Sequence, residues 1–211
     1  MIGSSNPFLA SDNSKSTKDV VTDFLQTIVL ALTFSLILYL VFLVPSIVDG
    51  PSMEPSFYDN ELLFANKTVQ WIGNTSFGEN YDYKRGDVII FRHLETNLIK
   101  RIIAVEGDTV RISSGSVYVN GKKLEESYIA PGIETWPPTG TRAFLEDNET
   151  IRVEEGTYFV LGDNRTVSKD SRYSEVGLVP REDIRGRVFL RYWPINRFGL
   201  IGAGEFVETS E

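Results

Sequence analysis

A serine held between two prolines and a lysine within an apolar strand are the residues of this sequence best suited to chemistry. Ser52 lies in the stretch VDGPSMEPSF, in which Pro51 and Pro55 restrict the backbone on either side of its hydroxyl. Lys100 lies in LIKRIIAV, where a buried cation must be paired or lose its charge. Burial lowers the pKa of a lysine, and a neutral amine can take the proton of a hydroxyl. The two residues could therefore form a nucleophile and its general base.

The run LIKRIIAV is expected to be a strand with two apolar faces. Strand periodicity gives one face Leu98, Lys100, Ile102 and Ala104, and the other Ile99, Arg101, Ile103 and Val105. Because arginine stays protonated in proteins, Arg101 needs a carboxylate partner. Read alone, each candidate also has a plain explanation. Lys100 could point into water from an edge strand, and Ser52 could belong to a linker.

Composition excludes several classes of function. The chain has 211 residues and a formal net charge of -8, without a cluster of lysine or arginine, so nucleic acid is not an expected partner. It has no cysteine, which excludes disulfides and thiolate metal sites. His93 is the only histidine, so a histidine-rich metal site is also excluded. We expect no metal and no cofactor. A general base near neutral pH must be His93 or a perturbed lysine or carboxylate.

The longest apolar run, 24–44, has no charged residue and would measure about 31 Å as a helix. The length and the absence of charge predict one transmembrane helix rather than a buried core helix. A cleaved signal peptide is also disfavoured, because its apolar region would be shorter. Lys15 and Lys18 precede the run, whereas Lys67 is the first basic residue after it. The positive-inside rule therefore places the tail, 1–23, in the cytoplasm.

The remaining residues, 45–211, are predicted to form a mainly β, extracytoplasmic domain attached to the plasma membrane by that single helix. Short segments rich in β-branched and aromatic residues predict strands at 86–92, 98–108, 109–113, 116–124 and 157–163. Asn120-Gly121 predicts a tight hairpin turn, and no long amphipathic helix interrupts the strands. Irregular insertions are expected at 71–83 and 130–147. The pattern gives no indication of the oligomeric state.

Four stretches follow the apolar run in a fixed order: GPSMEPSF, KRGDVIIF, IKRIIAVEGD and GDNRTVSKDSR. In order and spacing they resemble the successive boxes of bacterial type I signal peptidases, from the anchor to about Pro194. The family implies an antiparallel β catalytic domain of the signal-peptidase and self-cleaving-repressor type on the outer membrane surface. It also implies an enzyme that cleaves signal peptides from exported preproteins after small residues.

The resemblance assigns roles to individual residues. Ser52 would be the nucleophile, Lys100 the general base, and Ser168 the residue that hydrogen-bonds and orients the lysine amine. The last box would form a polar framework, in which Asp163 pairs with Arg101. The other members of that framework would be Arg165, Asp170 and Arg172. Met53, which could cover the site, and Pro55 would bind the substrate.

Two positions depart from the pattern of the family. Many relatives carry Ser-Gly before the nucleophile, where this chain has Gly50-Pro51. The serine hydroxyl that helps bind the oxyanion is therefore missing, and Pro51 has no N–H, so the second oxyanion donor is open. The last box has Thr166-Val167 in place of Asp-Asn, and we expect its turn to persist with altered hydrogen bonding.

Ser52 follows the apolar run by only eight residues, which would deliver its hydroxyl near the membrane surface. The aromatic residues Phe57, Tyr58 and Phe64 are expected in the lipid interface, where such rings are favoured.

Three other readings are open. Endoplasmic-reticulum and archaeal-like signal peptidases use histidine as base, a role that His93 could fill. Self-cleaving repressors also pair serine with lysine, but they have no membrane anchor and usually carry a DNA-binding region. A membrane-tethered β domain without catalysis could bind exported peptides or assemble with other envelope proteins.

Overall fold

The structure is a computed structural model that describes residues 16–72 and 81–209. Residues 1–15 of the predicted cytoplasmic tail and residues 73–80 of the first predicted insertion lie outside the described residues. The chain divides into two compact units, residues 1–41 and 42–211.

Helix α1 (Thr17–Phe42) accounts for the described part of the first unit. It begins where the backbone N–H of Ser16 donates to the carboxylate of Asp19 at 3.2 Å, as in a capping box. The helix has 26 residues, or about 39 Å, and by length and composition it could cross a membrane. It ends before the apolar run 24–44 does, because the last two residues of that run belong to strand β1.

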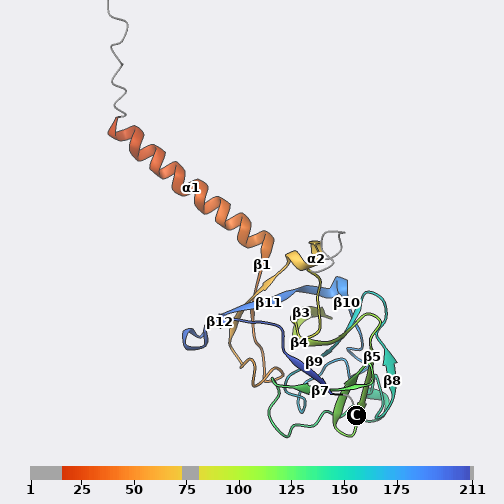
Figure 1. The fold of residues 1–211 in the computed structure, drawn as a ribbon. Helices are drawn as coiled ribbons and strands as arrows, with labels where there is room; N and C mark the ends of the chain where they lie inside the picture. Colours follow the sequence, from red (N-terminus) through yellow and green to blue (C-terminus); the bar gives the residue numbers. More distant parts are fainter. Residues whose placement is uncertain (1–15, 73–80, 210–211) are drawn as a thin grey trace, which may run out of the picture. The chain divides into compact units, whose positions relative to one another are not determined.

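The second unit consists of two antiparallel sheets (Figure 1). The eight-stranded sheet has the order β1-β2-β11-β3-β4-β9-β10, with β12 paired to β11. Its strands are β1 (Leu43–Ile47), β2 (Leu62–Asn66), β3 (Val88–His93), β4 (Thr96–Val105), β9 (Thr157–Leu161), β10 (Val179–Pro180), β11 (Ile184–Trp193) and β12 (Gly199–Leu200). The five-stranded sheet has the order β13-β7-β6-β5-β8. Its strands are β5 (Thr109–Ser113), β6 (Ser116–Val119), β7 (Lys122–Glu126), β8 (Thr150–Arg152) and β13 (Phe206–Thr209). The mainly β, antiparallel fold predicted from the sequence is confirmed.

The predicted hairpin at Asn120-Gly121 is confirmed. It joins β6 to β7, and its two residues have φ of 53° and 78°, the positive values that a type I′ turn requires. Strand β11, which pairs with both β2 and β3, was not predicted. Gly186 weakens its strand signal, but a Cβ there would lie 2.8 Å from the carbonyl oxygen of Asn66, so glycine permits close pairing.

Strand β4 contains a bulge that changes its two faces. Opposite β9, the register shifts between Ile102 and Ala104. Ala104 therefore packs in the same apolar cluster as Ile103, while Val105 packs beside the cluster of Ile102. The predicted strict alternation was wrong beyond Ile102, because the extra residue moves the following side chains to the opposite face.

Within the described part of the second unit, buried apolar side chains form three clusters. One joins the two sheets, with Ile103 of β4 and Val110 of β5 among its members. Another packs the residues that flank the candidate nucleophile, Met53 and Phe57, with Leu63 of β2. The turn that carries Ser52 is therefore anchored in the core on its C-terminal side.

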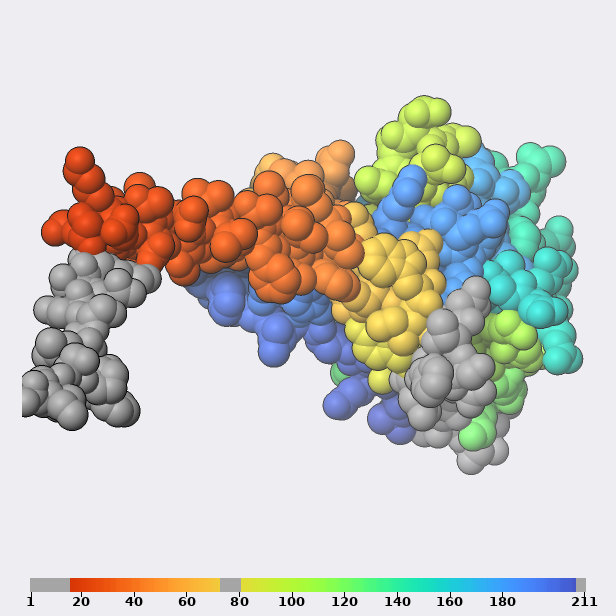
Figure 2. Space-filling view, turned by 90° about the horizontal axis from the view of Figure 1, so that it is seen from above, coloured from red at the N-terminus to blue at the C-terminus, as the bar shows by residue number. Residues whose placement is uncertain are grey.

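Among its described residues, 42–72 and 81–209, the second unit also has four short helices: α2 (Thr68–Ile72), η1 (Gly140–Arg142), η2 (Arg181–Asp183) and η3 (Ile195–Arg197). Helix α2 packs on β11, and Figure 2 shows these segments side by side. The insertion 130–147 contains η1 and an isolated β-bridge from Ala143 to Tyr173. This bridge holds the insertion against the residue that directly follows the last box.

Candidate active site

Ser52 lies on the turn that connects β1 to β2. The turn is closed at its base, where the N–H of Val48 donates to Glu61 and the N–H of Asn60 donates to Val48, at 2.8 and 2.9 Å. The carbonyl oxygen of Ser52 accepts a hydrogen bond from the N–H of Asn164 at 3.1 Å. The nucleophile candidate is therefore fixed both to the first sheet and to the last sequence box.

Lys100 lies on β4 and is only 2% exposed. Its Nζ is 2.8 Å from Oγ of Ser52 and donates a hydrogen bond to the carbonyl of Ile99 at 2.9 Å. Burial lowers the pKa of Lys100 from 10.5 to about 8, against the opposing effect of the carboxylates of Asp170 and Asp163. In its neutral form, the amine can accept the hydroxyl proton of Ser52 across this distance.

The lowered pKa leads to a prediction for the pH dependence of peptide cleavage. A lysine base works only when it is neutral, so if Lys100 is the base, kcat/KM should rise with pH and reach half of its plateau near pH 8. The measurement is kcat/KM for a peptide substrate between pH 6 and 10 in detergent. A flat profile between pH 7 and 9, in a protein that stays folded there, would contradict a lysine base.

Ser168 is buried, and within the described part of the chain its hydroxyl has no hydrogen-bond partner. The bond from Ser168 to the amine of Lys100, which the resemblance implies, is not present. The carbonyl of Ile99 accepts from the amine instead. Ser168 nevertheless lies near the turn of Ser52, because Oγ of Ser168 and the carbonyl oxygen of Ser52 both lie close to Gly162.

Arg101 and Asp163 form a buried ion pair next to the Ser–Lys pair. Nε and Nη2 of Arg101 lie 2.9 and 2.6 Å from the two carboxylate oxygens of Asp163. Nη1 donates to the carbonyl of Gly86 at 2.9 Å, and the guanidinium lies 4.0 Å from the ring centre of Tyr128. This carboxylate is the partner that the apolar strand pattern required for Arg101.

Arg165 binds a carboxylate of the second sheet. Both of its Nη atoms bond to the carboxylate of Glu126 on β7, and its Nε donates to the carbonyl of Gly162 at 3.0 Å. The hydroxyl of Tyr128 also donates to Glu126, and burial raises the pKa of Tyr128. Sequence reasoning missed Glu126, because the segment KKLEE has the pattern of a solvated strand.

Asp170 and Arg172 close the last box on itself. Nε and Nη2 of Arg172 lie 2.8 and 3.0 Å from the carboxylate oxygens of Asp170. The same carboxylate accepts from the N–H of Gly162 at 3.0 Å, and Arg172 donates to the carbonyl of Ser168 at 3.1 Å. The side chains of Asp170 and Arg172 thus fix the backbone of the last box at Gly162 and Ser168.

Gly162 is a site residue that the sequence analysis did not single out. A Cβ on Gly162 would lie 2.1 Å from Oγ of Ser168 and 2.5 Å from the carbonyl oxygen of Ser52. Such distances are far below van der Waals contact, so a side chain has no space there. The signal was present in the sequence, because this glycine opens the last box, GDNRTVSKDSR.

The two predicted substrate-binding residues lie in different surroundings. Met53 is fully buried in the core, whereas Pro55 is exposed. Pro55 lines a depression of about 230 Å³ together with Glu54, Tyr58, Ala130, Ile133, Asp163 and Asn164. Part of the insertion 130–147 therefore lies beside the site, and substrate binding by Met53 and Pro55 remains a prediction.

The backbone N–H of Ser52 is available for an oxyanion. Among residues 16–72 and 81–209 it has no hydrogen-bond partner, whereas the N–H of Gly50 donates to Asp59 at 2.7 Å. Pro51 has no N–H to offer. Of these three residues, only Ser52 thus has a backbone N–H that is free within the described part of the chain.

The aromatic residues near Ser52 are not all placed as predicted. Phe57 is 1% exposed and packs in the core, so its predicted position in the lipid interface was wrong. An apolar ring next to the turn is more stable in the protein core than at a polar surface. Phe64 stacks on Tyr192 with ring centres 4.3 Å apart, and Tyr58 is 45% exposed.

His93 lies at the end of the β3–β4 hairpin. It pairs with Thr96, whereas Ile89 pairs with Lys100. Four residues along a strand correspond to about 13 Å, so the backbones of His93 and Lys100 are separated by roughly this distance. The structure therefore brings Lys100, and not His93, to Ser52.

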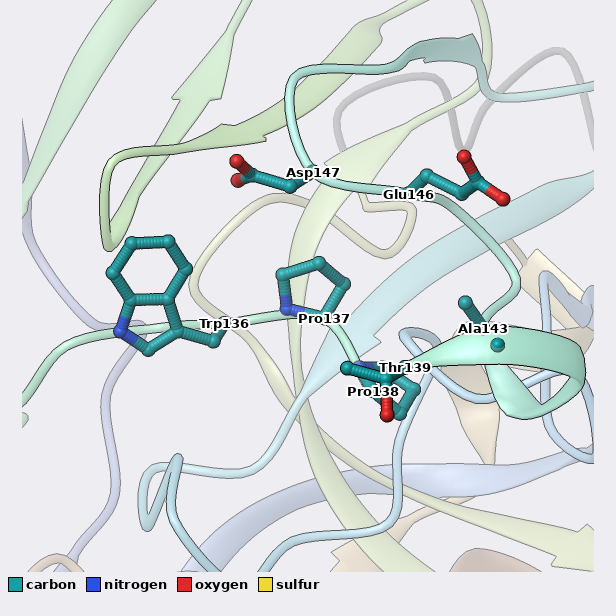
Figure 3. A pocket seen from close by; sticks show the side chains of 8 residues that line it. Trp136, Pro137, Pro138, Thr139, Ala143, Glu146 and Asp147 are labelled. Atoms are coloured by element: carbon teal, nitrogen blue, oxygen red, sulfur yellow. The ribbon is translucent and has the colours of Figure 1, made fainter.

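A larger cavity, of about 520 Å³, lies in the insertion 130–147 and includes neither Ser52 nor Lys100. Figure 3 shows the ring of Trp136 and the carboxylate of Asp147 on one side of it, and Ala143 on the other. The carbonyl of Trp136 accepts from Arg172 at 3.0 Å. The side chain of Arg172 thus links the last box to the backbone of the residues that line this cavity.

Comparison with known proteins gives a consistent result. The family model described as "Signal peptidase, peptidase S26" matches residues 21–193. Signal peptidase I of Bacillus licheniformis is 32% identical over 190 residues, which cover 89% of this chain and 97% of that protein. The probable signal peptidase I-2 of Synechocystis is 39% identical over 156 residues, which cover 73% of this chain and 65% of that protein. A crystal structure of a signal peptidase I from Enterococcus faecalis is 32% identical, with a TM-score of 0.40, and the match covers 50% of this chain and 96% of that one.

Proposed function

Because this chain belongs to the signal peptidase family, peptidase S26, we propose that it cleaves signal peptides from exported preproteins with Ser52 as nucleophile and Lys100 as general base. The observation that carries the proposal is the distance of 2.8 Å between Nζ of Lys100 and Oγ of Ser52. Its support includes the burial of the amine among apolar strands, which favours the neutral form.

The proposed reaction has two steps. In the first, the neutral amine of Lys100 takes the hydroxyl proton of Ser52, and Oγ forms a bond to the scissile carbonyl carbon. The resulting oxyanion is stabilised by the N–H of Ser52. As the tetrahedral intermediate collapses, the peptide C–N bond breaks, and the ammonium of Lys100 gives its proton to the leaving amine.

The second step releases the signal peptide. Neutral Lys100 takes a proton from a water molecule, whose oxygen attacks the ester carbonyl carbon. The bond between this carbon and Oγ of Ser52 then breaks, and the proton returns from Lys100 to Oγ. The products are a signal peptide with a free carboxylate and a mature protein with a free amine.

The buried ion pairs are proposed to hold this geometry. Asp163 is oriented by Arg101, and the N–H of the residue after it bonds to the carbonyl of Ser52. Asp170 raises the pKa of Lys100 and Arg172 lowers it, so this pair adds little net charge beside the base. Pro55 is proposed to contact the substrate directly, and fully buried Met53 to support the turn from beneath.

The second unit carries exposed apolar side chains that would favour contact with lipid. Ile47 lies opposite Leu62, which lies opposite Trp193 on the next strand, and Ile47 and Trp193 are each 54% exposed. Ile195 and Leu200 are more exposed still. Together with an uncleaved α1 anchor, this surface supports a site at the outer face of the plasma membrane.

The test is cleavage of a preprotein by the detergent-solubilised full-length chain. We expect a mature product whose new N-terminus follows a small residue at the cut and another two positions earlier, and no product from Ser52→Ala or Lys100→Ala. Cleavage that persists in Ser52→Ala would contradict the nucleophile. If the folded wild-type protein binds the signal peptide without cleaving it, the chain is a binding module rather than a peptidase.

Removal of the histidine distinguishes the two types of signal peptidase. His93→Ala should keep kcat/KM within about twofold of the wild type, because a surface substitution far from the dyad removes no proton acceptor. The measurement is the same cleavage assay, with Asn97→Ala on the same hairpin as the matched variant. A loss of 100-fold or more in His93→Ala alone would reassign the base.

A further inference from the structure

The C-terminal segment returns from the first sheet to the second. In Figure 1 the dark blue chain runs from β12, which pairs with β11, to the neighbourhood of β7, where β13 pairs with that strand. The family match ends at Trp193, so this segment lies beyond it. We propose that residues 203–209 form a clasp that positions the Arg101–Asp163 pair, with Gly204 as its point of contact. The inference rests on the proposed function.

The clasp shares a hydrogen-bond acceptor with Arg101. The N–H of Gly204 donates to the carbonyl oxygen of Gly86 at 2.9 Å. The same oxygen accepts from Nη1 of Arg101, also at 2.9 Å. Because both donors converge on one oxygen, the position of the C-terminal chain and that of the guanidinium depend on each other.

The approach at this point is too close for a side chain. A Cβ on Gly204 would lie 2.8 Å from Nη1 of Arg101 and 2.8 Å from ring atoms of Tyr128. A Cβ on Gly86 would lie 2.4 Å from the carbonyl oxygen of Gly204. The guanidinium is therefore enclosed by the ring of Tyr128 and by the backbone of Gly204.

The clasp also reaches the second cation of the framework. Phe206 lies opposite Glu126 in the β13–β7 pair, and its ring makes an edge contact with Tyr128, with ring centres 5.8 Å apart. Glu126 holds Arg165, whose Nε binds the carbonyl of Gly162. Two of the buried arginines of the site, Arg101 and Arg165, thus depend on groups that the C-terminal segment contacts.

Displacement of the clasp would affect Ser52 and Lys100 through the Arg101–Asp163 pair. The side chains of Arg101 and Asp163 are 4% and 1% exposed, and the strength of such a pair depends on the exclusion of water. The residue after Asp163 donates to the carbonyl of Ser52. A shift of Arg101 would therefore move the nucleophile and leave a carboxylate near Lys100 less neutralised.

The test compares two glycines in the same segment. Gly204→Ala introduces the overlap, whereas a Cβ on Gly202 meets no atom within 4 Å, which makes Gly202→Ala the matched control. We expect Gly204→Ala to lower kcat/KM by about 10- to 100-fold, mainly through kcat, because small displacements in an active site have effects of this size. Its pH profile should shift to higher pH, since a less neutralised Asp163 raises the pKa of Lys100. Gly202→Ala should match the wild type in both respects.

A second variant and a readout without catalysis keep the inference separate from the proposed function. A chain that ends after Gly202 keeps Ile201, which packs on the core, and should show the same loss and the same shift. Hydrogen exchange at residues 86–91 and 101–105 should accelerate in Gly204→Ala and not in Gly202→Ala. Normal kinetics and exchange in Gly204→Ala overturn the clasp and leave the peptidase intact. If the wild type does not cleave, the hydrogen-exchange data still decide whether the clasp exists. If Gly204→Ala does not fold, the kinetics of the chain that ends after Gly202 decide whether the clasp positions the ion pair.

Discussion

Replacing Lys100 by arginine is expected to lower kcat/KM for preprotein cleavage by about 10⁴-fold or more, although the substitution keeps a positive charge and a long side chain. A guanidinium does not lose its proton at any pH at which the protein is folded, so it cannot accept the hydroxyl proton of Ser52. The planar group also needs more hydrogen-bond acceptors than the carbonyl of Ile99 and the hydroxyl of Ser52 provide.

The control for this variant is Lys123→Arg, because Lys123 is exposed on β7. It should cleave like the wild type. Thermal unfolding of both variants in detergent shows whether each is folded. Activity of folded Lys100→Arg within tenfold of the wild type would mean that this residue is not the base. The same result would also remove the explanation for a pH profile centred near 8.

Gly162→Ala is expected to reduce cleavage by about 100-fold or more, although alanine is chemically inert. The new Cβ would overlap the hydroxyl of Ser168 and the carbonyl of Ser52, at 2.1 and 2.5 Å. Since the surroundings are packed, the turn that carries the nucleophile must move relative to Lys100. Such overpacking also destabilises a protein by about 1–3 kcal/mol.

Gly199→Ala is the matched variant for this test, because a Cβ there meets nothing within 4 Å. It should keep both activity and stability. The measurement is kcat/KM together with the free energy of unfolding. If Gly162→Ala is less stable but cleaves at the wild-type rate, the close contact serves the fold only and not the position of Ser52.

Local patterns drew attention to Ser52, Lys100 and Arg101: prolines around a hydroxyl, or a charge within an apolar strand. The resemblance to the family added Asp163 as the partner of Arg101. Charges in such strands are costly unless they are paired, so their partners must exist and can be sought. The same reasoning failed for Glu126, because a charged residue in a hairpin is usually solvated and nothing nearby in the sequence indicates its burial.

Other features were not accessible from local patterns. The bulge after Ile102 depends on how β4 pairs with β9, residues more than fifty positions apart in the chain. The burial of Phe57 depends on its packing against β2 and its neighbours. The position of Ser168 beside Gly162, without a bond to Lys100, depends on the conformation of a whole loop.

The sequence by itself determined the apolar helix, the antiparallel β domain, the hairpin at Asn120-Gly121 and the types of residue available for catalysis. These follow from periodicity and backbone preferences, which act over a few residues. Only the tertiary structure decided that the amine of Lys100 lies 2.8 Å from the hydroxyl of Ser52, and that Tyr128 and the C-terminal Gly204 enclose the neighbouring guanidinium of Arg101. The reason is physical: distances and the exclusion of water are set by contacts between segments that are remote in the chain.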